Sequence, residues 1–336
     1  MGFGSQSGQV IIRTQAVQGT FQADLPTSGI GLKLRSGSLG TNRDLLIPDP
    51  EIGGGRDTTD AYLGAVAWSG DYEFYTRLNA MLTLFAAGFG SVSAPVAVET
   101  GVKKFTVTPL DSSALPFLSI EERIGSGLEC FRYTDAVVNT LHLEAEANGY
   151  LQGTAGIIAA LQTAGATPSD ASTLWDNTNL IVGTNITVTY NGVQLPAKSF
   201  NFDLTNNFED DDFGLGSLFL KGLTGKGREV TGSFTIRPQD STLFRQASYG
   251  ATSATTAGGL STKAPLVIEA KTYEKIGATA VGTLKLTMPN FVLSPHSFDP
   301  SGDDVIETDI EGRAVRPAAG TPVCTAEFTV SRQTVA

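Results

Sequence analysis

The sequence predicts a mainly β protein of two tandem domains, each with one flanking α-helix. The chain has 336 residues, which is enough length for two domains. Its 38 glycines and its many threonine, valine and serine residues are spread over short alternating runs, as strands and turns require. Within residues 139–147, for example, Leu141 and Leu143 alternate with Glu144 and Glu146. Such alternation predicts a strand with one buried face and one wet face.

Helical spacing stands out in two places. The first is an apolar series from residue 72 to residue 85, which follows a good N-cap, Asp71, and ends at a good C-terminal stop, Gly88. The second is shorter, follows Asp240 and ends near Gly250. We expect both apolar stripes to pack in the core, because apolar residues are most often buried there.

The surroundings of the two expected helices also recur. A Gly-Arg-acid-x-Thr motif is followed each time by a strand, the helix, a proline-led apolar strand and two more strands. Chance recurrence of the motif is the alternative, and the matching order of later elements argues against it. We therefore predict a tandem duplication, with a first domain and N-terminal arm at 1–164, a linker at 165–179 and a second domain at 180–336. The repeat anchors are Gly55, Arg56, Thr59, Gly227, Arg228 and Thr231.

Composition argues against several functions. The net charge of −11 has the wrong sign for gripping phosphates. Two cysteines and two histidines suit neither a disulfide framework nor a histidine-rich metal site, and they indicate a reducing compartment. Glycine motifs for phosphates or dinucleotides and a nucleophile elbow are missing. The acidic runs at 209–212 and 299–304 lack EF-hand spacing and are interpreted as solvated loops. We expect no catalytic residue, no metal and no cofactor.

Membrane insertion and export are not expected either. The longest apolar stretch, residues 81–89, is about half of the ~18 residues that a membrane helix needs. The first residues lack the basic region and the apolar run of a signal peptide. We therefore expect a soluble protein.

Two segments resemble the tail tube proteins of long-tailed bacteriophages. These are residues 115–153 and residues 199–234, and the likeness extends to most of residues 20–335. It lies in element order, strand pattern and a few anchors, and it includes no catalytic signature. The second half departs from the pattern by a low-complexity insert at 251–263 and an acidic hairpin tip at 299–304.

The resemblance implies a fold and an assembly. Each domain would be a tail-tube-type β-sandwich or partial barrel with one flanking helix. Family members form rings that stack into a tube, with four strands per domain lining an inner barrel. The resemblance thus implies a structural virion protein of the tail, assembled in the host bacterial cytoplasm, whose acidic lumen is a conduit for DNA ejection.

The same resemblance implies the partners. They are further copies of the chain in homotrimeric, pseudo-hexameric rings, the tape-measure protein, the tail terminator and distal tail proteins, and DNA in transit without specific binding. No membrane partner is implied. A ring of six chains, with one half of each chain lying outside, is the alternative.

Two sets of site residues follow. The family's inter-ring loop corresponds to residues 44–55 and 207–226, so the inter-ring candidates are Asp44, Leu45, Leu46, Ile52, Phe213, Leu218, Phe219 and Leu220. The lumen-facing candidates are acidic residues that alternate with apolar neighbours, namely Glu144, Glu146, Glu307, Asp309 and Glu311. An outer, solvated surface is the alternative position for these carboxylates.

Two other functions fit parts of the composition. Other phage structural or surface β-sandwiches, such as a capsid decoration protein, a distal tail protein or an adhesin, are also β-rich and acidic. Polymerisation into tubes of constant diameter would distinguish a tube protein from them. A carbohydrate-active sandwich would need carboxylates and aromatic residues in one groove, and Trp68 and Trp175 are the only tryptophans available.

Overall fold

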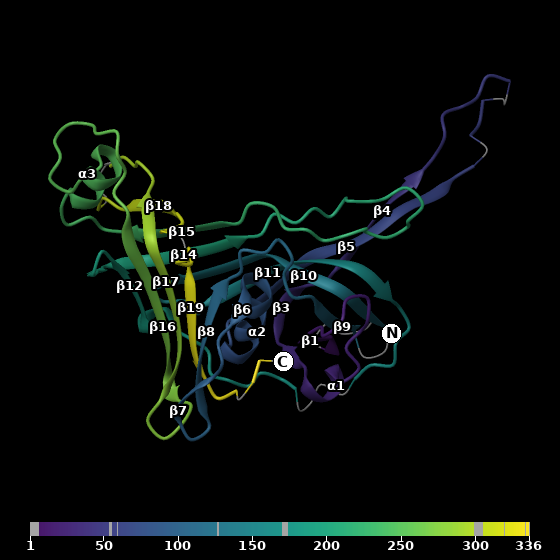
Figure 1. Cartoon of the computed structure of the whole chain (residues 1–336), viewed down its shortest axis with the longest axis horizontal. Coiled ribbons are helices and arrows are strands. Elements are labelled where there is room, and N and C mark those ends of the chain that lie inside the picture. Colours follow the sequence, from purple (N-terminus) through teal and green to yellow (C-terminus); the bar gives the residue numbers. More distant parts are fainter. Residues whose placement is uncertain are drawn as a thin grey trace.

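The computed structural model is mainly β, as the sequence predicts (Figure 1). It describes residues 7–53, 56–58, 60–125, 128–169, 174–298, 305–318, 320–332 and 334–335. The elements of the first half are β1 (Gln9–Thr14), α1 (Leu25–Ser28), β2 (Ile30–Leu32), β3 (Leu34–Gly37), β4 (Gly40–Leu46), β5 (Tyr62–Tyr75), α2 (Leu78–Phe89), β6 (Gly90–Val92), β7 (Val96–Glu99), β8 (Val102–Pro109), β9 (Leu118–Ile124), β10 (Glu129–Glu146) and β11 (Gln152–Thr163).

The second half begins with a short 3-10 turn, η2 (Gly183–Asn185), and then continues through strands and one helix. Its elements are β12 (Ile186–Tyr190), β13 (Val193–Leu195), β14 (Ala197–Thr205), β15 (Glu229–Ile236), α3 (Thr242–Tyr249), β16 (Ala264–Lys275), β17 (Val281–Leu293), β18 (Thr308–Ala314) and β19 (Thr325–Val330).

The first long helix begins later than the sequence predicts. Residues 71 and 72 lie inside β5, so Asp71 is no N-cap, and α2 starts at Leu78. The helix ends at Phe89, and the residue that stops it is Gly90, whose φ of 96° is left-handed, and not Gly88. The spacing of Tyr72 and Tyr75 fits a helix, but residues 68–75 pair with β11, and that tertiary pairing decides the local structure. The prediction was better for α3, which lies within the expected residues 240–250.

The strands form an open, branched sheet that does not close on itself. Its central section has the order β5-β11-β10-β14-β15-β18, with every neighbouring pair antiparallel. The pairing of β10 with β14 joins the first half of the chain to the second, from Thr140 opposite Thr205 to Glu146 opposite Ser199. Both halves therefore contribute to one continuous sheet.

The strand pairings repeat between the two halves. In the first half β1 pairs with β2 and β9, β9 with β10, β10 with β11, β11 with β5, and β5 with β4. In the second half β12 pairs with β13 and β16, β16 with β17, β17 with β18, β18 with β15, and β15 with β14. This parallel supports the predicted duplication. The division at 165–179 into two domains stays a prediction, because the halves also share one core.

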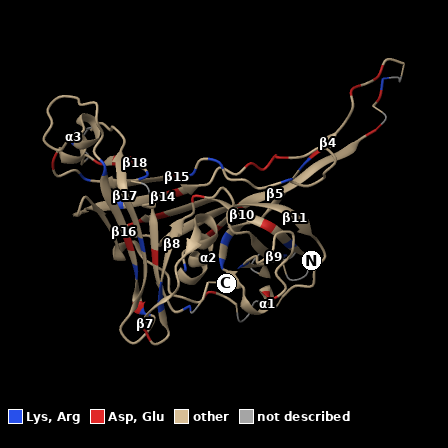
Figure 2. Cartoon of the chain, viewed as in Figure 1, with Lys and Arg blue, Asp and Glu red and all other residues tan. Residues whose placement is uncertain are grey.

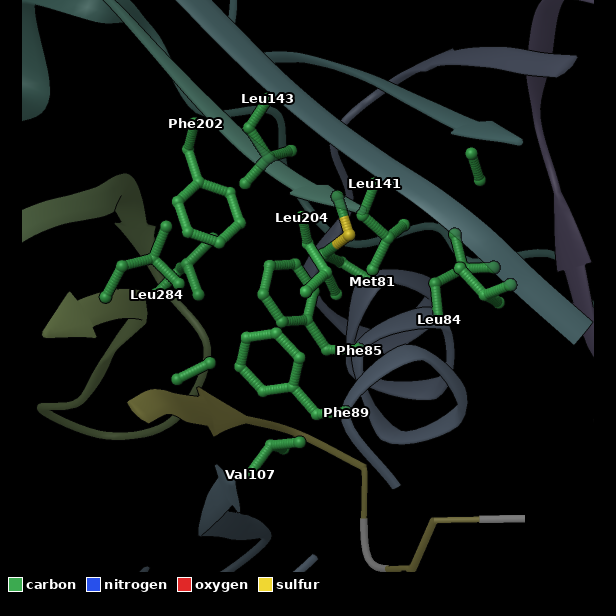
Figure 3. Packing of buried hydrophobic residues seen from close by; sticks show 14 of the residues in the cluster. Met81, Leu84, Phe85, Phe89, Val107, Leu141, Leu143, Phe202, Leu204 and Leu284 are labelled. Atoms are coloured by element: carbon green, nitrogen blue, oxygen red, sulfur yellow. The ribbon is translucent and has the colours of Figure 1, made fainter. Parts of the chain in front are cut away.

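Helix α2 lies at the centre of that shared core (Figure 3). Phe85 packs against three aromatic rings, with centroids 5.3 Å away at Phe89, 6.1 Å at Phe202 and 5.4 Å at Phe328. Phe202 and Phe328 belong to the second half of the chain, so a helix of the first half packs against residues of both halves. Leu84 is also fully buried.

Truncation of the α2 core should destabilise the whole chain. Leu84→Ala is expected to lower the free energy of unfolding by about 2–5 kcal/mol, because it removes buried methyl groups and leaves a cavity. The same truncation at Leu215, which is 109% exposed, is the control and should change it little. Chemical denaturation of both variants measures the difference, and equal stabilities would contradict the central position of α2.

Candidate functional site

From Thr140 to Glu146 of β10, and in the residues paired with them, the central section of the sheet has one apolar face and one acidic face. In β10, Leu143 is buried in the core, while Glu144 and Glu146 are exposed. Residues directly opposite each other in antiparallel strands point to the same side, so the register extends this division across the sheet. Leu143 lies opposite the buried Phe202 of β14, and Glu144 lies opposite Asn201.

We call the wet side of this section the acidic face. Carboxylates reach it from β5, β10, β14, β15 and β18, and red segments, which mark Asp and Glu residues, recur along the central strands in Figure 2. Its members by register are Asp71, Glu73, Glu144, Glu146, Asp203, Glu229, Asp309 and Glu311.

The structure thus brings four of the five lumen-facing candidates onto one face of one sheet. Glu144 and Glu146 reach it from β10, and Asp309 and Glu311 from β18. Glu307 directly precedes β18 and forms ion pairs with Lys198 and Arg237 at the margin of this face. A lumen-facing position for these carboxylates stays a prediction.

Sequence reasoning missed the other four members of the acidic face. Asp71 and Glu73 were assigned to a helix, although Glu73 alternates with the buried Tyr72 and Phe74. Asp203 lies between the buried Phe202 and Leu204, and Glu229 precedes the buried Val230. Period-two alternation was therefore present in the sequence at each position, and a systematic search for it would have found them.

Some carboxylates of the acidic face have polar partners. Arg313 Nη2 lies 2.9 Å from Glu229 Oε1, and Thr235 Oγ1 donates a hydrogen bond of 2.5 Å to Asp309 Oδ1. Glu311 lies opposite Ser233. The face is therefore acidic but interspersed with hydroxyl groups and a few positive charges.

His142 lies between two carboxylates of the acidic face. Its Nδ1 is 2.6 Å from Asp203 Oδ1, and its Nε2 is 3.6 Å from Glu144 Oε2. The hydrogen bond to Asp203 raises the pKa of His142 above its ordinary value, although partial burial opposes the shift. Protonation of His142 thus adds a positive charge at the middle of the acidic face.

The first inter-ring candidate segment is a projecting hairpin. Asp44, Leu45 and Leu46 lie in β4 and not in a loop, and β4 and β5 extend together away from the body (Figure 1). We call β4, β5 from Tyr62 to Leu63 and the connection between them the arm. Its apolar side chains are strongly exposed: Leu45 is 57% exposed and Ile52 is 108% exposed. An exposed apolar hairpin of this kind is typical of an interaction surface.

The second candidate segment, between β14 and β15, folds back onto the first half of its own chain. The backbone N–H of Val66 donates a 2.8 Å hydrogen bond to Leu218 O, and Phe219 stacks on Trp68 at 6.4 Å between centroids. Leu220 is buried. Phe213 and Leu218 remain partly exposed, at 37% and 54%. Part of this segment is therefore already covered within one chain.

The repeat anchors occupy different environments. Arg228 directly precedes β15, and its Nε donates to Asn206 Oδ1 at 3.1 Å, while Arg56 is exposed in the arm. Burial lowers the pKa of Arg228. Thr231 lies in β15 opposite Asp203. Gly227 lies before Arg228, and Gly55 and Thr59 lie outside the described residues.

Metal and thiol chemistry have little basis in the described part of the chain. No group there of three or more His, Cys, Asp or Glu residues could hold a metal ion. Cys130 and Cys324 are buried, and burial raises their pKa values to about 11 and about 12, so both thiols stay protonated. Trp68 lies under Phe219 and Trp175 against Gly31, so the two tryptophans are engaged separately. No helix among the described residues has the length and apolar character to span a membrane.

Fold and surface together define a mainly β protein, whose notable features are a two-faced sheet and an apolar arm. The chain belongs to the phage tail tube family: a family model described as phage tail tube protein matches residues 5–314. The chain is thus a component of the virion tail, as its sequence predicts. A comparison with curated proteins finds no match.

Removal of the Asp203 carboxylate should lower the pKa of His142. Asp203→Asn takes away the hydrogen bond that favours the imidazolium, and an NMR titration of the histidine ring protons measures the result. The chain has only two histidines, so His296 is an internal control. Its pKa is lowered by burial and should not respond.

The same pair should make stability depend on pH. Because the folded-state pKa of His142 is raised, its stabilisation is full below the unfolded value of about 6.5 and is lost as the pH rises through the folded-state pKa. The stability advantage of the wild type over Asp203→Asn should therefore shrink across that window. An unchanged His142 pKa in the variant would contradict the assignment.

Proposed function

We propose that the chain assembles into stacked rings that form the tail tube, and that DNA passes through an acidic lumen during ejection. The observation that carries the proposal is the continuous central sheet, which joins both halves and presents one face of carboxylates. An open sheet with two free ends is suited to continuation by further copies of the same chain. The role is structural and not catalytic, in keeping with a tail tube family.

An acidic lumen would suit the passage of DNA. A closed barrel of about 24 strands, at ~4.8 Å spacing and ~40° tilt, leaves a bore of roughly 38 Å, which is wider than a duplex of about 20 Å. The gap between wall and duplex is comparable with the Debye length of ~8–10 Å. Carboxylates on the wall would therefore repel the phosphates, and the duplex would slide without binding.

The proposed ring contains three chains. If each half acts as one tube unit and the ring needs six units, three chains complete it with pseudo-sixfold symmetry. The β10–β14 junction, which sets the two halves side by side in one sheet, supports this arrangement over a hexamer with one half outside. The other proposed partners are the tape-measure protein inside the tube and the tail terminator and distal tail proteins at its ends, with assembly in the host cytoplasm.

Tube formation and the arm can be tested together by electron microscopy of purified protein. The wild type should form rings or open-ended tubes of constant diameter. Ile52→Asp should stop at single rings, because it puts a charge on the most exposed apolar residue of the arm. Leu260→Asp is the control, at 86% exposure on the insert after α3, and should elongate normally. Absence of rings and tubes in the wild type would refute the proposal.

The position of the acidic face can be tested by thiol labelling of assembled tubes. Both native cysteines are buried, so Glu311→Cys supplies a reporter on the acidic face and Ser253→Cys a reporter on the exposed loop after α3. A maleimide coupled to a protein wider than the bore should label Ser253→Cys in tubes, but not Glu311→Cys. Dissociated subunits of both variants should react. Equal labelling in tubes would place the acidic face outside.

A further inference from the structure

One end of the central sheet is an unpaired strand edge. β4 pairs with β5 from Gly40 opposite Ser69 to Leu46 opposite Tyr62. Within the described part of the chain, no strand pairs with the other edge of β4. All 7 residues of β4 are exposed. A free edge of this length is a template for pairing with another chain.

The opposite end of the sheet, beside α3, is open as well. β17 leaves its neighbour β16 at Phe291, which lies opposite Ala264, while its other edge stays paired with β18 as far as Ser294, whose N–H donates to Glu311 O at 2.8 Å. Past Phe291, no strand among the described residues pairs with the edge that faced β16. The chain then continues through the described residues 294–298. A cavity of about 270 Å³ adjoins this end. Its apolar lining includes Leu195, Ile236, Phe244, Phe298 and Ile310.

The chain contains its own example of how such ends meet. In the repeated pairing pattern, β14 is the counterpart of β4, and β10 is the counterpart of β17. β10 leaves β9 at Ala136, and its following residues, from Thr140 to Glu146, pair antiparallel with β14. By the same pattern, β4 should pair with the continuation of β17 past Phe291.

The partner of β4 must come from a second copy. The arm and the α3 end lie at opposite extremes of the longest axis of the molecule in Figure 1, so one chain cannot join its own two ends. A contact between unlike ends of identical chains is heterologous, and it closes into a ring when the rotation between copies permits.

The two helices also indicate that a second copy would bind at the α3 end. α2 is covered by second-half elements: Arg332 Nη1 donates to Asn79 O at 3.2 Å, and Phe328 packs on Phe85. In α3 only Gln246 is buried, and the helix borders the apolar cavity. Among the described residues, α3 thus receives less cover than its counterpart, and it lies at the end where a second copy would continue the sheet.

We propose that the free edge of β4 pairs antiparallel with residues 291–298 of a second copy, whose α3 cavity is covered by the incoming chain. This seam repeats between chains the β10–β14 junction within each chain. The proposal rests on the proposed ring assembly and names its contact surfaces: the β4 edge at one end, and the β17 continuation with the α3 cavity at the other.

Site-specific crosslinking tests the seam in the full-length chain. Asn42 and Ser294 lie on the acidic side by alternation with their neighbours, so Asn42→Cys and Ser294→Cys in one chain should react with a short bis-maleimide across the seam. The expected product is a ladder of covalent oligomers that ends at the ring. Two mixed single-cysteine variants should yield dimers only. Asn42→Cys with Ser253→Cys is the control pair and should give no ladder.

A second variant tests the cavity. Val193 lines its rim and is 64% exposed, so Val193→Arg should leave the monomer folded while it blocks the incoming chain. Rings should be lost in Val193→Arg and kept in Tyr273→Arg, which alters a residue of 61% exposure on β16. Rings without the Asn42–Ser294 ladder, or rings in Val193→Arg, would overturn the proposed seam but not the proposed assembly into a tube. A wild type that never assembles would instead refute the proposed function.

Discussion

The antiparallel pairing of β10 with β14 is the constraint on which the rest of the structure depends. It fixes the two halves of the chain in one register, so that Leu143 meets Phe202 in the core and Glu144 meets Asn201 on the acidic face. A slip of one residue would exchange the two faces of every following strand. The register is held because both α2 and the aromatic residues of the second half pack on the apolar side.

Much of this arrangement follows from the alternation of apolar and polar residues along each strand, and the sequence reveals that alternation wherever a strand has one wet face. That is why the sequence alone predicts a shared face for Glu144, Glu146, Asp309 and Glu311. At Tyr72, local spacing does not decide between a strand and a helix. Its spacing suits a helix as well as a strand, and the deciding interaction is its pairing with Ala155, 83 positions later in the chain. A contact of that sequence separation is not visible in the helical spacing, although the alternation of Glu73 with the buried Tyr72 and Phe74 is compatible with a strand.

The Gly-Arg motif shows a different limit, because identical letters acquired different environments. Arg228 is held by Asn206 at the base of β15, and Arg56 is exposed in the arm. The same asymmetry separates the two long connections. The segment before β15 has the first half beside it and packs on Trp68. The arm has no such neighbour among the described residues of its own chain, so its leucine and isoleucine side chains remain exposed to water. Duplication therefore repeats the strand topology more faithfully than the connections.

The mixture of charges on the acidic face is consistent with two opposing demands in the proposed tube. Carboxylates that repel passing phosphates also repel one another, and ring closure would bring the carboxylates of several chains onto one concave wall. Arg313 and the titratable His142 reduce that repulsion at separate points, while Thr235 donates a hydrogen bond to Asp309 without adding charge. Salt screens both effects over a similar distance of ~8–10 Å. A wall that is acidic, but diluted by hydroxyl groups and a few cations, can therefore keep DNA mobile without preventing its own assembly.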